Sequence, residues 1–179
     1  MLTLILAESA LETIPKALWT HPAIRRYSER RVKHPQFLLL DRSYHHAAMK
    51  RLEQNEKRGR PDIVHFALLE ALGSPLNKER LLQTYVHTIN DQVITVNPET
   101  RLPRNYERFV GLMEQLFELG RVPPTGQILL KLERKTLPQL LGAITATHVV
   151  VFSREGSPHT LEEVGLRLSA EETPVVIVG

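Results

Sequence analysis

The residues best placed for chemistry in this sequence are arginines beside prolines that can start a helix. In the first such segment Arg60 precedes Pro61, and proline is favoured at the first position of a helix. A helix N-terminus carries unpaired N–H groups and a partial positive charge, so a base beside it costs about 0.3–1 kcal/mol unless an anion binds. When an anion does bind, the N–H groups and the guanidinium contact it jointly. The segment therefore indicates an anion site.

A similar arrangement occurs around Pro103. Arg101 and Arg104 flank this proline, and Arg108 follows one turn later. On a helix that starts at Pro103, Arg104 and Arg108 lie on one edge, away from the apolar stripe, so both should face solvent. Two such segments predict an arginine-lined site for a polyanion. The alternative is that the arginines are solvated or paired with carboxylates nearby in the sequence. Those carboxylates are Asp62, Glu99 and Glu107.

Asp62 lies in the first turn of the first helix and has more than one interpretation. It is a favourable partner for the helix dipole. It could also pair with Arg60 and fix the guanidinium toward a ligand, which is a positioning role. As the nearest carboxylate it is the candidate for a base as well, although the positioning role is the better match to its place in the helix.

Other polar residues have plainer explanations. The histidine pair at 45–46 lacks a matched third ligand, so it is weak support for a metal site. Asp41 or Ser43 is better interpreted as the cap of the helix that follows. The basic run at 25–33 is either a solvated helix face or an extension of a nucleic-acid contact. Tyr106 could stack on a base or be an ordinary surface aromatic.

Composition limits the classes of protein to which the chain can belong. Its 179 residues suit one domain, residues 1–179, with a single core. The formal net charge of +3 favours anionic partners, but the margin is small. The chain has no cysteine, which excludes disulfides, thiol nucleophiles and cysteine zinc sites and is compatible with a reducing compartment. The apolar N-terminus is too short for a signal peptide, and no apolar run is long enough to span a membrane. We therefore expect a cytoplasmic protein.

Short apolar runs alternate with helical patterns, which is typical of an α/β domain with a largely parallel sheet. Several of the runs are continuously apolar, as expected for strands covered on both faces. The expected strands are 2–7, 37–40, 85–89, 93–96, 149–152 and 175–178. Asn90, Asp91 and Gln92 separate the third strand from the fourth and predict a hairpin there.

Apolar residues at helical spacing predict three helices. The expected helices are 61–72, 103–119 and 160–168. Gly120 ends the second of them, and the stretch 120–127 is read as an ordinary loop inside one domain.

Five segments of the chain resemble a known family. They are Gly59–His65, Ser74–Lys78, Tyr85–Thr88, Val96–Tyr106 and Arg108–Leu116. They are similar to the nucleolar essential protein family, whose members are pseudouridine-N1-specific methyltransferases of small-subunit ribosomal RNA in the SPOUT class. The similarity covers most of the chain from about residue 37 onward, and the compact form without long insertions is similar to the archaeal members.

The resemblance implies an α/β knot fold, a homodimer, S-adenosylmethionine as the methyl donor and a role in ribosome biogenesis. It assigns RNA contact to arginines that match Arg60, Arg101, Arg104 and Arg108. Asp62 matches the aspartate that pairs with and orients the first of these. The resemblance and the charge pattern thus select the same arginines. His65 and His87 also lie in matched segments but on apolar faces, so we expect structural roles for them.

The resemblance also places part of the donor site at the end of the sequence. In the family, the strand that matches 173–179 continues into a glycine-rich loop, then a strand and helix that pass through the knot and complete the cofactor pocket. Because the sequence given ends at Gly179, we expect this knot segment to be missing from it. The donor-site residues that remain are Ile177, Val178 and Gly179, with Ser153 at the end of the preceding strand.

The expected reaction is methyl transfer to a ring nitrogen of a base splayed out of an RNA loop. Arg60 is expected to stabilise negative charge on that base. A second hypothesis is a ribosome assembly factor whose binding to ribosomal RNA matters more than its catalysis. A third is a related SPOUT enzyme that methylates a ribose oxygen. Donor binding separates the second from the first, and the identity of the methylated product separates the third.

Overall fold

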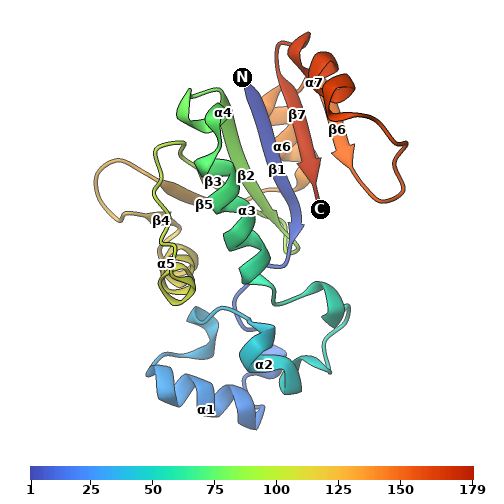
Figure 1. Ribbon diagram of the computed structural model, residues 1–179. Helices are drawn as coiled ribbons and strands as arrows, with labels where there is room; N and C mark the ends of the chain where they lie inside the picture. Colours follow the sequence, from blue (N-terminus) through green and yellow to red (C-terminus); the bar gives the residue numbers. More distant parts are fainter.

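The computed structural model describes residues 1–179 and is built around one seven-stranded sheet. The strands lie in the order β4-β5-β3-β2-β1-β7-β6, as Figure 1 shows. Their bounds are Leu2–Ser9 for β1, Leu82–Thr88 for β2, Gln92–Val96 for β3, Arg121–Val122 for β4, Leu130–Arg134 for β5, His148–Phe152 for β6 and Pro174–Val178 for β7. Strands β2, β1, β7 and β6 run parallel, and β3, β5 and β4 extend the sheet in antiparallel pairs. The α/β class is confirmed, with the parallel pairing concentrated in one half of a mixed sheet.

Alternating apolar residues of β1 contribute to two cores, one on each face of the sheet. Leu6 of β1 packs with helices α3 (Pro61–Gly73) and α5 (Tyr106–Leu119) on one face. Ile5 and Ala7 pack with α6 (Leu137–Ile144) on the other. This alternation is the two-residue period of a strand covered on both sides. The short helix α4 (Pro75–Lys78) and the helix α7 (Leu161–Ser169) complete the layers.

The residues between β1 and α3 form a separate helical lobe, residues 10–60. It contains helices α1 (Pro22–Arg31) and α2 (Arg42–Met49) and short 3-10 turns at Lys16–Leu18, Pro35–Phe37 and Asn55–Lys57. It has its own small core of eight buried side chains, among them Ile24, Leu38 and Met49. Figure 1 shows the lobe beyond the carboxyl ends of β1 and β7. None of the helices in the protein has both the length and the apolar character needed to cross a bilayer.

Two of the expected elements are wrong in their type or bounds. No strand forms at 37–40: Phe37 ends a 3-10 turn, and Leu39 makes a single bridge to Thr13. The segment is apolar because Leu38 faces the core of the lobe while Leu39 faces the core of the sheet. Helix α5 starts at Tyr106, not at 103, because the Asn105 side chain accepts a hydrogen bond from the N–H of residue 108 and caps the helix there.

Other elements were expected correctly or not at all. Strands β1, β2, β3, β6 and β7, the β2–β3 hairpin and the helices α3 and α7 lie where the apolar patterns predicted them, within a few residues. The sequence patterns missed α4, β4, β5 and α6, and β4 lies within the stretch 120–127 that was expected to be a loop. In β5 exposed Lys131 alternates with buried or half-buried neighbours, which leaves little apolar signal in a short strand toward the end of the sheet.

Candidate active site

The first arginine segment forms a doubly hydrogen-bonded ion pair at the start of α3. Arg60 occupies the N-cap position and Pro61 the first helical position, as predicted. The Arg60 guanidinium donates from Nε and Nη2 to the two carboxylate oxygens of Asp62, each at 2.8 Å. These hydrogen bonds hold the pKa of Asp62 below its usual range. Because both oxygens are engaged and the pKa is lowered, Asp62 is suited to orient Arg60 and poorly suited to accept a proton.

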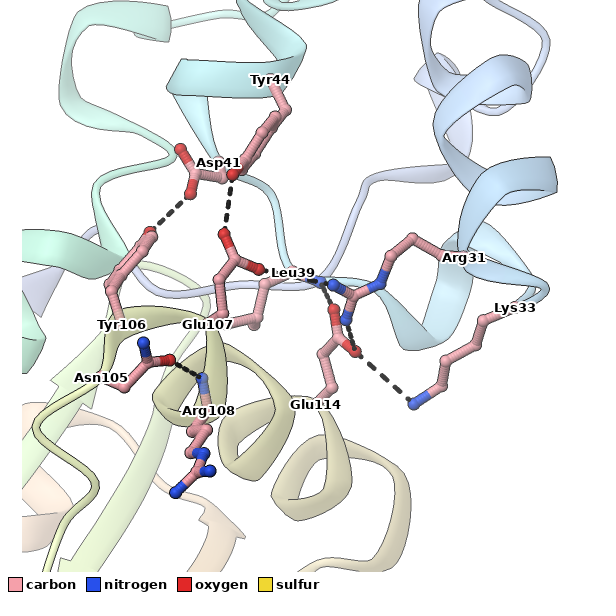
Figure 2. Close-up of polar contacts among 10 residues, drawn as sticks. All are labelled: Arg31, Lys33, Leu39, Asp41, Tyr44, Asn105, Tyr106, Glu107, Arg108 and Glu114. Atoms are coloured by element: carbon pink, nitrogen blue, oxygen red, sulfur yellow. Dashed lines mark hydrogen bonds and ion pairs between the residues drawn. The ribbon is translucent and has the colours of Figure 1, made fainter.

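The other three arginines stand free. The side chains of Arg101, Arg104 and Arg108 are exposed and form no hydrogen bond or ion pair within the chain. Figure 2 shows the Arg108 guanidinium pointing away from Glu107, its neighbour in the sequence. Three unpaired guanidinium groups this close in sequence are available to an external anion.

The carboxylates that could have neutralised these arginines are committed elsewhere. Glu99 accepts a hydrogen bond from Arg80 at 3.1 Å. Glu107 accepts one from the Tyr44 hydroxyl at 2.7 Å and lies 3.6 Å from the Arg31 guanidinium. The third, Asp62, is held by its own arginine. The interpretation that nearby acids simply pair with the free arginines is therefore wrong for this structure.

A histidine holds the two arginine segments side by side. The Nε2 atom of His65, in α3, lies 2.7 Å from the carbonyl oxygen of Pro103, which can only accept, so His65 donates. The His65 ring also stacks on Phe109 of α5, with centroids 4.3 Å apart. Leu102 packs against the core of the sheet. The start of α3 and the segment before α5 are thus fixed against each other, and His65 has the structural role expected for it.

A buried carboxylate ties the helical lobe to the start of α5. One oxygen of Asp41 accepts the N–H of Ser43, so Asp41 is the one of the two candidate residues that caps α2. The other oxygen accepts the hydroxyl hydrogen of Tyr106, as Figure 2 shows. Burial, and then this hydrogen bond, raise the pKa of Tyr106. Tyr106 is thus a half-buried link between the lobe and α5, neither a free stacking platform nor an ordinary surface aromatic.

The histidine pair does not form a metal site. The His45 ring is fully buried, and its Nδ1 atom accepts the backbone N–H of Asp41 at 2.9 Å. Burial lowers the pKa of His45 to about 4, so the ring is neutral at pH 7. No cluster of three or more His, Asp or Glu side chains in the protein is arranged to hold a metal ion.

A cavity of about 290 Å³ opens beside Arg60 at the carboxyl ends of the parallel strands. It is lined by the end of β1 (6–10), by the first turns of α3 including Ile63, and by Val178 and Gly179 at the end of β7. Strand β1 is the topological switch point of the parallel strands, because the next strand in the chain, β2, pairs with one of its edges and β7 pairs with the other. Ligands of open α/β sheets bind at this place. The volume is near the lower end of small-molecule pockets, about 300–1,000 Å³.

Residues 4–179 match the family model described as EMG1/NEP1 methyltransferase. The chain belongs to this family. It is 51% identical to the ribosomal RNA small subunit methyltransferase Nep1 of Thermococcus onnurineus, over all of this chain and 81% of the relative. It is 52% identical to the protein of the same name from Pyrococcus furiosus, over 99% of this chain and 79% of the relative.

A solved structure gives the same result for the fold. The crystal structure of Archaeoglobus fulgidus Nep1 bound to S-adenosylhomocysteine matches with a TM-score of 0.82 and 40% sequence identity. The match covers 99% of this chain and 88% of that one. The mixed α/β sheet described above is therefore the fold of an EMG1/NEP1 methyltransferase.

The residues expected to hold the methyl donor lie at the same edge of the sheet, but only part of them reaches the cavity. Val178 and Gly179 line it, whereas the Ile177 side chain is buried in the core against α6. Ser153 follows Phe152, which pairs with Val178, so it stands at the same edge without lining the cavity. A Cβ atom at position 179 would lie 2.8 Å from the carbonyl oxygen of Ala7, so the close approach of β7 to β1 here requires glycine.

The sequence analysis named Arg60, Val178 and Gly179 but none of the other cavity residues, among which Glu8 and Ile63 are the most informative. Glu8 lies at the end of β1 in a left-handed conformation, with φ of 46°. Ile63 is 53% exposed although it lies in an apolar helix. The sequence held one sign of this role for Ile63, which is apolar but lies off the buried stripe of α3. Which side of the helix faces the cavity could be identified only from the fold.

Proposed function

We propose that this EMG1/NEP1 family member transfers a methyl group from S-adenosylmethionine to N1 of a pseudouridine in small-subunit ribosomal RNA. The observation that carries the proposal is a small cavity beside Arg60 at the carboxyl ends of the parallel strands, together with three unpaired arginines in a segment that His65 holds against α3. Arginines of this kind suit phosphates of an RNA loop, and the cavity suits one base turned out of that loop. Arg101, Arg104 and Arg108 are assigned to the RNA backbone.

The edge formed by β1 and β7 fits part of the donor. The glycine at 179 leaves room next to the carbonyl of Ala7, and the cavity wall there is mainly apolar. In this proposal the backbone of Ile177, Val178 and Gly179 would contact the donor, with Ser153 beside them. When bound, S-adenosylmethionine supplies an electrophilic methyl group. The chain itself supplies orientation, because a displacement requires the acceptor atom to lie in line with that methyl group.

Arg60 acts on the acceptor base. N1 of pseudouridine carries a proton that is lost to solvent as the new bond forms, so negative charge develops on the ring and its carbonyl oxygens. A guanidinium held in place by Asp62 stabilises that charge without having to reorganise. Residues 60 and 62 are therefore proposed as catalytic and positioning groups, respectively.

The choice of pseudouridine rests on which atom is free. In uridine N1 forms the glycosidic bond, whereas in pseudouridine the bond is to carbon and N1 bears hydrogen. The test is mass spectrometry of nucleosides from two RNA stem-loops that differ only in uridine or pseudouridine at the acceptor position, each treated with enzyme and donor. We expect methylation of the pseudouridine RNA alone, on the base. Methylation of both RNAs, on ribose, would overturn the N1 assignment.

A SPOUT-type knot, a homodimer and a cytoplasmic location are part of the same proposal. Apolar side chains stay exposed next to the cavity and on α7, and a knot segment and a second copy would cover them. They are Ile63, Phe66, Val178, Leu161 and Leu166. Light scattering of the purified full-length protein should give the mass of two chains, and a monomer mass at micromolar concentration would overturn the homodimer.

A further inference from the structure

The helical lobe carries a groove that plays no part in the site described above. It lies between α1 and α2, has a volume of about 450 Å³, and is lined by Ala23, Arg26, Tyr27, Arg30, Ser43 and Tyr44. Four of these six residues are cationic or aromatic, and Ser43 adds a hydroxyl. Helices α1 and α2, which form the groove, lie beyond the carboxyl ends of β1 and β7, on the side of the molecule where α3 begins (Figure 1).

Two arginines of the groove are free to bind an anion. Helix α1 has four arginines, and one of them, Arg31, is committed to Glu114 at 3.1 Å and Glu107 at 3.6 Å. Lys33, just after the helix, pairs with Glu114 and Glu118. Arg26 and Arg30 are exposed and have no carboxylate partner. In the basic run, Arg31 and Lys33 therefore join the lobe to α5. Arg26 and Arg30 face solvent.

The aromatic rings of the groove form a surface on which a base can stack. The Arg30 guanidinium carbon lies 5.3 Å from the centroid of the Tyr27 ring and 6.0 Å from that of Tyr44. Tyr27 is buried, while Tyr44 is 44% exposed and presents its ring at the surface. The Tyr44 hydroxyl donates to Glu107, which fixes the ring. A fixed aromatic ring beside a guanidinium is the arrangement that binds single-stranded nucleic acid.

The groove is linked to the first turn of α5 by a hydrogen bond. The residue that anchors Tyr44 is Glu107, in the first turn of α5, and the next residue is the free Arg108. Glu107 itself is engaged, because its carboxylate accepts the Tyr44 hydroxyl hydrogen and lies 3.6 Å from the Arg31 guanidinium. The remaining acid of α1, Glu29, is outside the groove lining. The carboxylate that contacts Tyr44 of the groove is therefore already engaged, which leaves Arg26 and Arg30 for an external anion.

We propose that the groove between α1 and α2 binds a single-stranded segment of the RNA that flanks the modified nucleotide. Arg26 and Arg30 contact its phosphates, and one base stacks on Tyr44. The inference rests on the proposed RNA substrate and adds a second contact to it. The lobe thus serves as a clamp on the flank, while Arg60 and the free arginines near α5 hold the loop.

The experiment compares two RNAs with the full-length protein. One is a pseudouridine stem-loop alone, and the other carries about ten additional single-stranded nucleotides on each side. Binding is measured by fluorescence anisotropy from 50 to 300 mM salt. Arg26→Gln and Arg30→Gln should each reduce the salt slope for the long RNA by about 0.7 and leave the short RNA unchanged. Tyr44→Leu should weaken the long RNA by about fivefold or more.

Arg25→Gln is the matched control, because it removes the same charge from the same helix outside the groove lining. It should leave the slope for the long RNA near the wild-type value. Circular dichroism melting checks that each variant is folded. An equal loss in Arg25→Gln, or an unchanged slope in both groove variants, would overturn the proposal.

This test separates the clamp from the main function. Methylation of the short stem-loop should proceed normally in Arg26→Gln and Arg30→Gln, because neither residue lies in the cavity. If the groove proposal fails, that methylation remains. If wild-type protein methylates neither RNA, the proposed function has failed independently of the groove.

Discussion

Replacing Asp62 by asparagine tests whether Asp62 orients Arg60 or accepts the proton of the acceptor base. Asparagine keeps the size of the side chain but presents an NH₂ group where Arg60 Nη2 now donates at 2.8 Å, so one of the two hydrogen bonds becomes a donor–donor contact. The pair is about half exposed, at 44% and 49%, so folding stability should change by less than about 1 kcal/mol. The main effect should therefore be on the rate of methyl transfer.

The expected size of the rate effect follows from the two roles. If Asp62 only orients Arg60, Asp62→Asn should lower kcat/KM by roughly 10–100-fold, the range typical for a residue that supports another group. Arg60→Ala should lower it by roughly 10²–10³-fold, as for loss of a group that stabilises transition-state charge. The double variant should then be no worse than Arg60→Ala, because Asp62 has nothing left to orient.

Single-turnover methylation of a pseudouridine stem-loop measures all four rates. The lowered pKa of Asp62 keeps it ionised at neutral and mildly acidic pH, so no rate limb in that range should come from it. Losses that multiply in the double variant would refute the orienting role. So would a rate in Asp62→Asn that rises steadily with pH as hydroxide replaces a missing base.

Three further outcomes are expected. Arg104→Ala and Arg108→Ala should each reduce the salt slope of RNA binding by about 1. Arg80→Ala is the control and should leave the slope unchanged, because Arg80 is paired with Glu99. A wild-type slope in Arg104→Ala and Arg108→Ala would show that neither arginine contacts a phosphate. Tyr106→Phe should lower the free energy of unfolding by about 1–3 kcal/mol in urea titration, because a buried carboxylate loses its partner; no change would mean that the hydrogen bond is not formed in solution. The pKa of His45 is 6.5 in the unfolded chain and about 4 in the folded protein, so the free energy of unfolding should fall by up to about 3 kcal/mol as the pH drops from 6.5 toward 4. In His45→Leu this part of the pH dependence should be absent from urea titrations made at several pH values.

The elements that sequence patterns predicted well are those with a strong apolar signal. Strands β1, β6 and β7 are nearly continuous apolar runs, and α3 has a proline at its first position. The start of α5 was misplaced because Pro103 is equally acceptable in an extended segment, and the Asn105 cap is a weaker signal than a proline. Leu39 was taken for a strand residue because burial between two cores produces the same apolar run as a sheet.

The sequence identified the arginines of the site but not which of them are paired with a carboxylate. Whether Arg104 and Arg108 are free depends on Glu99 and Glu107, which lie close to them in the sequence. Each acid is taken by a partner from another part of the chain, and for Glu107 this is Tyr44, 63 residues away. Sequence spacing contains no information about such a contact. The cavity is likewise formed by segments far apart in the chain, at the ends of β1 and β7.

The most direct test of the central claim measures RNA binding and methyl transfer together in Arg60→Ala. Full-length protein is given a pseudouridine stem-loop and S-adenosylmethionine carrying a labelled methyl group, and both the dissociation constant and the label on the RNA are recorded. We expect the label to fall by roughly 10²–10³-fold while RNA affinity falls only a fewfold, because the other arginines remain. Undiminished labelling in this variant would contradict the assignment of the reaction to the cavity beside Arg60.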